Sequence, residues 1–426
     1  MIKIFNLDDI GIEEILLRED SSLDEKIELA VDEIIDDIKR NGDLAVKKYT
    51  EKFDKAKIDS LVVSEDEIEL AWNNVDPDFI SILKEAAENI ELFHSKQVKN
   101  DFICDSGKGR ITGQKVTPIN HVGIYVPGGT ARYPSTVLMN AIPAKIAGVN
   151  NISIVTPPNE DGSIPDVILA AAKIAGVDNI YKVGGAQSVA ALSYGTETIP
   201  KVDKIVGPGN IFVATAKRKV FGRVDIDMIA GPSEILVLAD ETANTSYIAA
   251  DMLSQAEHDE LASAILVCTS KQQALEVQSE IEIQLKNLKR ESIARKSIEN
   301  RGKIIVANNI DDAIDVVNVI APEHLEICTD DPFIYLNQVK NAGSIFLGNN
   351  VPEALGDYFA GPNHTLPTSG TAKFSSPLSV DDFVKKSQFI YYSRKALEEV
   401  EEKVSRFARE EGLEAHAKSI EIRFNK

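Results

Sequence analysis

Residues 151–196 read NISIVTPPNEDGSIPDVILAAAKIAGVDNIYKVGGAQSVAALSYGT, and this stretch decides the fold. Two short apolar runs, 151–156 and 179–183, have the length and branched side chains of buried strands. Each run precedes a segment, 166–176 or 186–194, whose apolar residues recur at helical spacing. Strands that alternate with helices of this length predict βαβ units and a parallel sheet.

The same alternation continues on both sides of this stretch. Further strands are expected at 203–206, 234–239, 263–268, 303–307, 325–328 and 344–347, and further helices at 134–147, 211–220, 243–257, 271–286, 310–320 and 332–341. Together these segments predict an α/β fold with two similar doubly wound, Rossmann-like modules, each built on a parallel sheet.

The two ends of the chain differ from this alternating part. We expect a short N-terminal arm over residues 1–21 and a helical C-terminal tail over residues 377–426. Between them we expect one α/β domain from residues 22–125 plus 234–376, and a second from residues 126–233. The tail has too few apolar residues to fold alone, so it should pack on another domain or another subunit.

The first of these α/β domains should begin with helices. Capping boxes, which start helices, are expected at Ser22 with Glu25 and at Ser64 with Glu67. Asn41-Gly42 has the residues that end a helix, and residues 78–97 have the apolar spacing of another amphipathic helix.

Composition excludes several classes of partner. The chain of 426 residues has a formal net charge of −21, which repels phosphate backbones and argues against a nucleic acid partner. No apolar run approaches the roughly 18 residues of a membrane span, and the N-terminus lacks the pattern of a signal peptide. We therefore expect no membrane partner.

Cysteine usage indicates a reducing compartment, and we expect a cytoplasmic protein. Only three cysteines occur, Cys104, Cys268 and Cys328, and they are far apart in the sequence. Cys268 and Cys328 end apolar strands, so we interpret them as core residues rather than as nucleophiles for aldehyde oxidation. Cys104 has no notable neighbour.

Two of the six histidines adjoin residues that suit metal binding or proton transfer. Gln255 and His258 are three residues apart and share a helix face, which suits a metal ion, although an ordinary polar helix end has the same pattern. Glu323 and His324 follow Pro322 in a tight helix-to-strand connection. An adjacent acid and imidazole suit proton transfer, and a surface turn is the alternative.

Two further histidines lie near the C-terminus. Asp357 and His364 belong to a long polar loop, which is either a functional loop or a structural one. Glu411 and His416 lie on a charged helical segment, where a solvent-facing histidine is the simpler interpretation.

Side chains from distant segments could nevertheless form one zinc site. One glutamine, two histidines and one aspartate from these segments could make a closed set of nitrogen and oxygen ligands. The motif HExxH is absent, and the reversed form HxxEH fails because Ser254 and Ile320 occupy the positions of its first histidine. These absences argue against the common zinc hydrolases.

Evidence for a nucleotide site is weaker. The motif GxGxxG does not occur, but three glycine-rich turns precede predicted helices: Pro127-Gly128-Gly129, Gly184-Gly185 and Gly207-Pro208-Gly209-Asn210. Helix N-termini that a ligand can approach closely favour phosphate groups. Because every α/β fold has such turns, three in one module favour a nucleotide only modestly.

Several longer strings resemble the histidinol dehydrogenase family, nearly from end to end and in order. They are HVGIYVPGG at 121–129, YPSTVLMNAIPAKIAGV at 133–149, VGGAQSVAALSYGT at 183–196, KIVGPGN at 204–210, AGPSEILVLAD at 230–240, DMLSQAEHD at 251–259, APEHLEI at 321–327, GDY…GPNHTLPTSG at 356–370 and EGLEAHAKSIEIR at 411–423.

The resemblance implies a zinc- and NAD-dependent enzyme of histidine biosynthesis. Such an enzyme oxidises L-histidinol to L-histidine through L-histidinaldehyde and consumes two NAD⁺. The implied ligands of one zinc ion per subunit are Gln255, His258, Asp357 and His416, and the implied proton-transfer residues are Glu323 and His324.

It also implies the remaining contacts. Substrate would be bound by Ser233, His364 and Glu411 together with His324 and the zinc ligands, and NAD, in the 126–233 domain, near Tyr125, Gln187 and Asn210. The family's members are homodimers in which the C-terminal tail reaches into the partner's site, which agrees with a tail that cannot fold alone.

Three other functions remain open on the residues alone. A relative could oxidise another amino or sulfonated alcohol with the same zinc and NAD residues. A zinc hydrolase could use Glu323 as a base, and a protein without catalytic activity could bind a nucleotide. Formation of NADH distinguishes the dehydrogenases from both of the others.

Overall fold

The computed structural model describes residues 1–16, 25–129, 132–229 and 231–424. The chain forms two compact units: unit 1 contains residues 1–97 and 119–383, and unit 2 contains residues 98–118 and 384–426. The capping box expected at Ser22 lies outside the described residues. Within the described ranges, no helix is long and apolar enough to cross a membrane.

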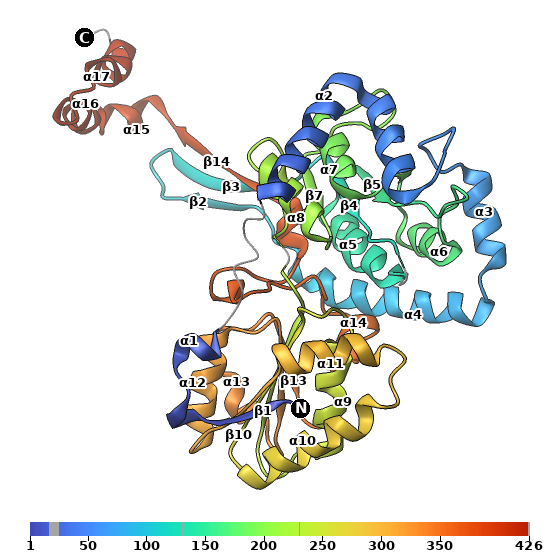
Figure 1. The fold of residues 1–426 in the computed structure, drawn as a ribbon. Coiled ribbons are helices and arrows are strands. Elements are labelled where there is room, and N and C mark those ends of the chain that lie inside the picture. The colour runs from blue at the N-terminus through green and yellow to red at the C-terminus, as the bar shows by residue number, and fades with distance from the viewer. Residues whose placement is uncertain (17–24, 130–131, 230, 425–426) are drawn as a thin grey trace. The chain divides into compact units, whose positions relative to one another are not determined.

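The stretch that decides the fold lies in a five-stranded parallel sheet of unit 1 (Figure 1). Its strands are β4 (His121–Tyr125), β5 (Asn151–Thr156), β6 (Asn179–Lys182), β7 (Lys204–Val206) and β8 (Asp225–Ile226), in the order β6-β5-β4-β7-β8. Its helices are α5 (Pro134–Ala147), α6 (Asp166–Ala175), α7 (Gly185–Tyr194) and α8 (Ile211–Val220). The chain moves outward from β4 to β6 and then returns to β7 on the other side of β4.

A second parallel sheet of unit 1 has six strands. They are β1 (Lys3–Asn6), β9 (Glu234–Ala239), β10 (Ser263–Cys268), β11 (Lys303–Val306), β12 (His324–Cys328) and β13 (Ser344–Leu347), in the order β1-β11-β10-β9-β12-β13. Its helices are α9 (Thr245–Ala256), α10 (Lys271–Leu285), α11 (Glu291–Asn300), α12 (Ile310–Ile320), α13 (Phe333–Leu336) and α14 (Glu353–Tyr358).

The two sheets share one strand order, which confirms the prediction of two similar doubly wound modules. The six-stranded sheet has one additional edge strand, because β1 from the N-terminal arm pairs in parallel with β11. The arm also contains the short helix α1 (Ile12–Ile15). Three helical segments differ from expectation: α11 and α14 were not predicted, and α13 covers only part of 332–341. Asp357 therefore lies on α14 and not in the polar loop where it was expected.

Three N-terminal helices pack on the five-stranded sheet module. They are α2 (Glu25–Asp54), α3 (Glu65–Asn74) and α4 (Pro77–His94), and they contact α5 to α8. We expected residues 22–125 to form one domain with 234–376, which would place these helices and β4 with the six-stranded sheet. The helices instead pack on the five-stranded sheet module, and β4 is one of its strands. An amphipathic helix has an apolar face in its sequence, but the sequence does not say which sheet that face meets.

Local signals in these helices are confirmed. Ser64 accepts a hydrogen bond from the Glu67 N–H and the Glu67 carboxylate accepts one from the Ser64 N–H, as a capping box requires. At Gly42 the backbone leaves the helical region (φ 49°), so α2 is bent where a helix end was expected.

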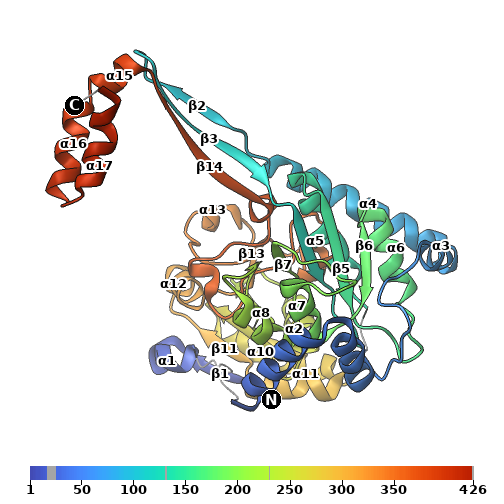
Figure 2. The same ribbon diagram turned by 90° about the horizontal axis from the view of Figure 1, so that it is seen from above.

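Unit 2 contains an antiparallel sheet followed by short helices (Figure 2). The strands are β2 (Phe102–Asp105), β3 (Arg110–Pro118) and β14 (Val384–Tyr392), in the order β14-β3-β2, and the helices are α15 (Arg394–Glu398), α16 (Glu401–Glu410) and α17 (Glu414–Glu421). The tail over residues 377–426 was expected to be helical. Residues 384–392 are instead a strand, because their β-branched and aromatic residues pair with β3 along its whole length.

Short 3₁₀ turns complete the described structure at Leu7–Asp9, Ser95–Gln97, Thr371–Lys373, Val380–Phe383 and Ile422–Phe424.

Candidate active site

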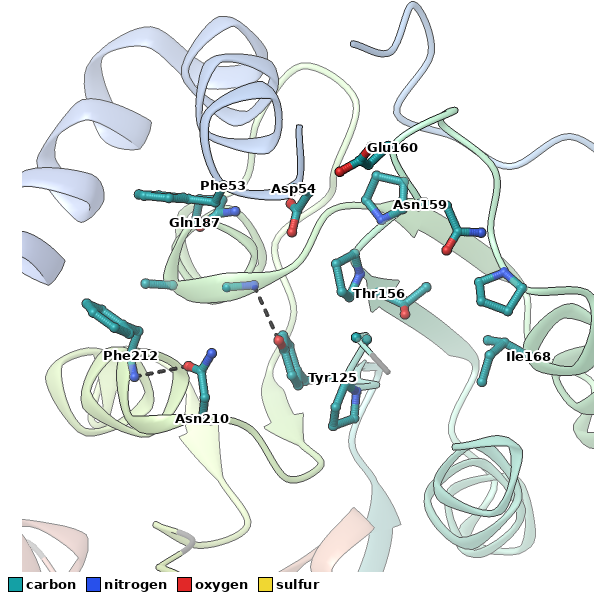
Figure 3. Close-up of a pocket in the computed structure, with 18 of the residues that line it drawn as sticks. Phe53, Asp54, Tyr125, Thr156, Asn159, Glu160, Ile168, Gln187, Asn210 and Phe212 are labelled. Atoms are coloured by element: carbon teal, nitrogen blue, oxygen red, sulfur yellow. Dashed lines mark hydrogen bonds between the residues drawn. The ribbon is translucent and has the colours of Figure 1, made fainter. Parts of the chain in front are cut away.

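A cavity of about 660 Å³ lies at the carboxyl ends of the five-stranded sheet (Figure 3). Tyr125 ends β4, Thr156 ends β5, and Asn210 follows β7; all three line the cavity. In doubly wound folds, ligands bind at the carboxyl ends of the strands, at the point where the strand order reverses. At this point the connections after two neighbouring strands run to opposite sides of the sheet. Here that point lies between β4 and β7.

The three residues expected to contact NAD all line this cavity. The Tyr125 hydroxyl accepts a hydrogen bond from the Gly185 N–H at 3.3 Å, and burial raises the pKa of Tyr125 to about 12. Asn210 caps α8 by accepting from the Phe212 and Val213 N–H groups. Both amide atoms of Gln187 are shielded from solvent, and neither has a hydrogen-bond partner in the described part of the chain. A ligand with polar groups would satisfy this amide.

The turn after β7 has a fixed backbone. Gly207 has φ +106°, and a Cβ there would lie 2.2 Å from the backbone oxygen of Tyr125, so only glycine fits. Lys217 Nζ donates to the Gly207 oxygen at 3.0 Å, and Asp227 Oδ2 accepts from the Gly207 N–H at 2.7 Å. The Lys217 and Asp227 side chains also form an ion pair and are 2% and 1% exposed.

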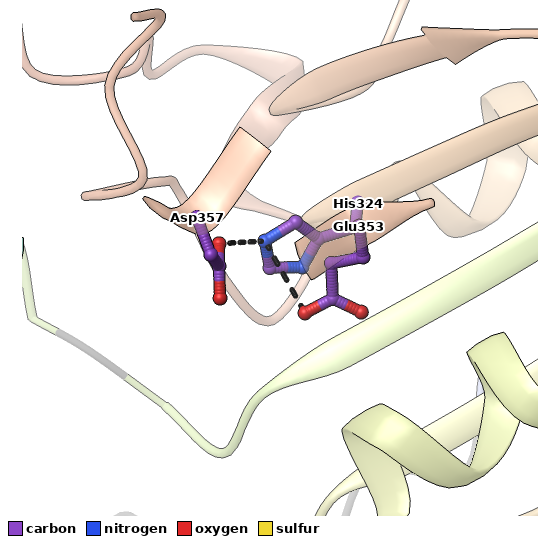
Figure 4. Close-up of side chains that lie close together, drawn as sticks. All are labelled: His324, Glu353 and Asp357. Carbon is purple, nitrogen blue, oxygen red and sulfur yellow. Dashed lines mark ion pairs between the residues drawn. The ribbon is translucent and has the colours of Figure 1, made fainter. Parts of the chain in front are cut away.

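A second cluster of candidate residues lies at the amino ends of β9, β12 and β13. Glu323 Oε2 accepts from the Glu234 N–H at 2.9 Å, and His324 Nδ1 donates to the Glu234 backbone oxygen at 3.0 Å. His324 Nε2 lies 3.8 Å from both Glu353 Oε1 and Asp357 Oδ1, too far for a hydrogen bond (Figure 4). This buried nitrogen has no hydrogen-bond partner among the described residues.

The charges in this cluster strongly perturb one another. Burial raises the pKa of Glu323 to about 8 and that of Glu353 to about 7. Burial lowers the pKa of His324, but Glu353, Glu323 and Asp357 raise it by more, so it lies well above the usual value. Burial raises the pKa of Asp357, and the neighbouring imidazoles lower it by more. Such perturbed groups are common where protons are transferred.

Other expected site residues surround the same cluster. Gln255 is fully buried, its amide nitrogen lies 2.7 Å from Glu353 Oε1, and its amide oxygen accepts from the Glu234 N–H at 3.1 Å. His258 and His364 lie close enough to Asp357 for their charges to lower its pKa.

A cavity of about 120 Å³ is lined by His324, Asp357 and His364 together. Ser233 directly precedes β9, beside Glu234. Glu411 and His416 belong to unit 2, where both are exposed.

The donor set fits a metal ion such as zinc. Ligand atoms of His324, Glu353 and Asp357 all lie within 4.8 Å of one another, and a Glu353 oxygen is buried without a hydrogen-bond partner in the described chain. Imidazole nitrogens and carboxylate oxygens are normal zinc ligands. Sequence reasoning missed Glu353, although it lies four residues before Asp357, on the same face of α14.

His94, His121 and the two buried cysteines have surroundings that indicate a role in the fold and not in the chemistry. His94 pairs with Gln97 at 2.7 Å, and His121 with Ser153 at 2.8 Å. Cys268 and Cys328 are buried, as expected, and burial raises the pKa of the Cys268 thiol to about 11. Such a thiol stays protonated at neutral pH and is a poor nucleophile.

The chain is similar to known proteins along nearly its whole length. The family model described as histidinol dehydrogenase matches residues 17–424. A histidinol dehydrogenase of Clostridium acetobutylicum is 61% identical over 391 residues, which cover 92% of this chain and 91% of the relative. One of Listeria monocytogenes is 59% identical over 399 residues, which cover 94% of this chain and 93% of the relative.

A solved structure is similar over the whole chain. The crystal structure of histidinol dehydrogenase from Elizabethkingia anophelis matches with a TM-score of 0.95 at 40% identity, and covers 100% of this chain and 98% of that chain. The chain therefore belongs to the histidinol dehydrogenase family, whose members are NAD-dependent oxidoreductases.

Proposed function

We propose that this chain oxidises L-histidinol to L-histidine through L-histidinaldehyde, with two NAD⁺ and one zinc ion per subunit, as the last step of histidine biosynthesis. The observation that carries the proposal is the pairing of Glu323 with His324, whose buried Nε2 lacks a hydrogen-bond partner in the described chain. A base placed beside a second titratable group suits two successive oxidations, because each needs a proton removed.

Zinc would be held by Gln255, His258 and Asp357 with the partner subunit's His416. Glu353 supports this set, because its carboxylate accepts from the Gln255 amide nitrogen and leaves the amide oxygen as the donor that a metal can use. When bound, zinc supplies a positive charge and a fixed point for the substrate's imidazole and amine. Ser233, His364 and Glu411 would bind the rest of the substrate.

NAD would occupy the 660 Å³ cavity, near Tyr125, Gln187 and Asn210. When bound, NAD⁺ accepts hydride from the carbinol carbon and then from the hydrated aldehyde. The unsatisfied Gln187 amide supports this assignment, because it favours a bound group with polar atoms.

His324 and Glu323 would handle the protons. His324 accepts the hydroxyl proton in the first step, Glu323 activates the water that hydrates the aldehyde, and His324 accepts a proton again in the second step. Because neighbouring carboxylates raise the pKa of His324, its neutral, accepting form requires a compensating positive charge in the cluster. The buried cysteines have no role in this scheme.

The active protein would be a homodimer with sites shared between subunits. Unit 2 exposes large apolar side chains, among them Ile103 (67%), Ile390 (75%) and Phe407 (69%), and burial of such side chains against a partner is favourable. The three free cysteines support a cytoplasmic location.

The test is NADH formation from L-histidinol by the purified protein, with and without a chelator. Two NADH per histidinol, lost on chelation and restored by zinc, are expected. Absence of NADH with zinc-loaded protein would contradict the proposed substrate. Screening of amino and sulfonated alcohols would then test the related dehydrogenase, while substrate cleavage without NADH would indicate a hydrolase.

A further inference from the structure

Asp54 contributes an unpartnered carboxylate to the 660 Å³ cavity. It is the last residue of α2, which also contributes Ile34 and Phe53 to the cavity wall. Its Oδ2 is shielded from solvent and has no hydrogen-bond partner in the part of the chain that the structure describes. Figure 3 shows the carboxylate pointing into the cavity, toward the side where Tyr125 lies.

A carboxylate at this place is costly for the free protein. The C-terminal end of a helix carries partial negative charge, which repels Asp54. Burial raises its pKa to about 6, and no cation among the described residues offsets this effect. A buried carboxylate without a partner destabilises the fold, and such unfavourable placements are typical of residues that bind a ligand.

The cavity needs an acceptor for ribose hydroxyls if it binds a dinucleotide. In doubly wound folds, an acidic side chain after the second strand commonly has this role. Here that strand is β5, which ends in Thr156 and is followed by Pro157, Pro158 and Asn159, none of which is acidic. Glu160 comes next, but its side chain is 75% exposed and pairs with Lys55 at 3.6 Å.

We propose that Asp54 accepts hydrogen bonds from a ribose of NAD and thereby selects NAD over NADP. The inference rests on the proposed dinucleotide site and names the residue that decides which dinucleotide enters. NADP carries an additional phosphate on the ribose, whose charge a nearby carboxylate repels. Among the described residues that line the cavity, Arg132 is the one cation, and it is exposed.

The experiment measures binding without turnover. NADH and NADPH are titrated by their fluorescence against the zinc-loaded protein, without histidinol, for the wild type, Asp54→Asn, Asp54→Ser and the control Glu260→Gln. The wild type should bind NADH more tightly than NADPH. Both Asp54 variants should lose NADH affinity by about 10-fold or more, because a hydrogen bond to a charged group is lost, and should keep or gain NADPH affinity.

Glu260→Gln should keep the wild-type ratio of the two affinities, because Glu260 is exposed, pairs with Lys296 and does not line the cavity. A wild-type ratio in both Asp54 variants, with native thermal melting and normal zinc content, would overturn the role of Asp54 and leave the proposed function intact. Failure of the wild type to bind NADH at all would instead overturn the dinucleotide site itself.

Discussion

Lys217 and Asp227 form a buried ion pair that holds the backbone of Gly207 from both sides. Lys217 donates to the carbonyl oxygen of Gly207 and Asp227 accepts from its N–H, so the polar groups of the two peptides that flank this residue are satisfied. Gly207 also contacts the backbone of Tyr125, where the proposed NAD site begins. The pair therefore links the stability of this module to the shape of its cavity.

Lys217→Met should destabilise the protein by about 3–5 kcal/mol, because Asp227 is left buried and uncompensated. Urea unfolding measures this loss, and the NADH affinity should fall with it. The control is Lys296→Met, which removes a pair with Glu260 in which both side chains are more than half exposed. It should cost less than about 1 kcal/mol. Equal losses in the two variants would contradict the role of the buried pair.

The double variant Glu323→Gln, His324→Ala should lower the rate of NADH formation by about 100-fold or more, because the proton acceptors are lost. Its NADH affinity should be unchanged, since neither residue lines the 660 Å³ cavity. Stopped-flow absorbance and fluorescence titration measure the two quantities. Near-wild-type turnover would refute the proposed proton-transfer pair.

Asp357→Asn should weaken zinc binding strongly, because a direct carboxylate ligand is replaced. Glu353→Gln should weaken it by about 10–100-fold if Glu353 acts as proposed, because it then lies outside the four ligands and orients Gln255. Equilibrium dialysis against a competing chelator measures both, with Glu260→Gln as an exposed control. Unchanged zinc affinity in Asp357→Asn would exclude Asp357 from the site.

Asp54→Asn should stabilise the protein at neutral pH. The folded-state pKa of Asp54, about 6, lies above the usual 3.8, so the folded protein loses stability as pH rises between these values and carries the full cost above pH 6. The gain should be about 1 kcal/mol at pH 7.5, after allowance for solvent that screens this partly buried group, and should shrink toward pH 4. Thermal melting at several pH values checks this, and a gain independent of pH would contradict it.

Shared sites predict complementation between two inactive variants. Asp357→Asn and His416→Ala homodimers should each be inactive, but a mixed dimer has one site with Asp357 and the partner subunit's His416 both intact. Co-expression of the two chains should therefore restore about a quarter of wild-type activity, since half of the dimers are mixed and each has one working site. No recovery in isolated mixed dimers would place both ligands in one subunit.

Most elements of unit 1 follow from the sequence. The observed bounds of β5, β9, β10, α5, α8 and α12 equal the predicted ranges. This agreement has a local cause, because a strand or helix that buries one face must repeat its apolar residues with its own period. The same local reasoning found the Ser64 capping box and the burial of Cys268 and Cys328.

Contacts between distant segments were decided only by the tertiary structure. The sequence did not say that α2 packs on the five-stranded sheet, that residues 384–392 pair with β3, or that Glu353 faces His324. Asp54 and the Lys217–Asp227 pair likewise have no sequence motif. Local periodicity determines which face of a segment is apolar, but the partner of that face, and of each buried charge, depends on how the whole chain closes around it.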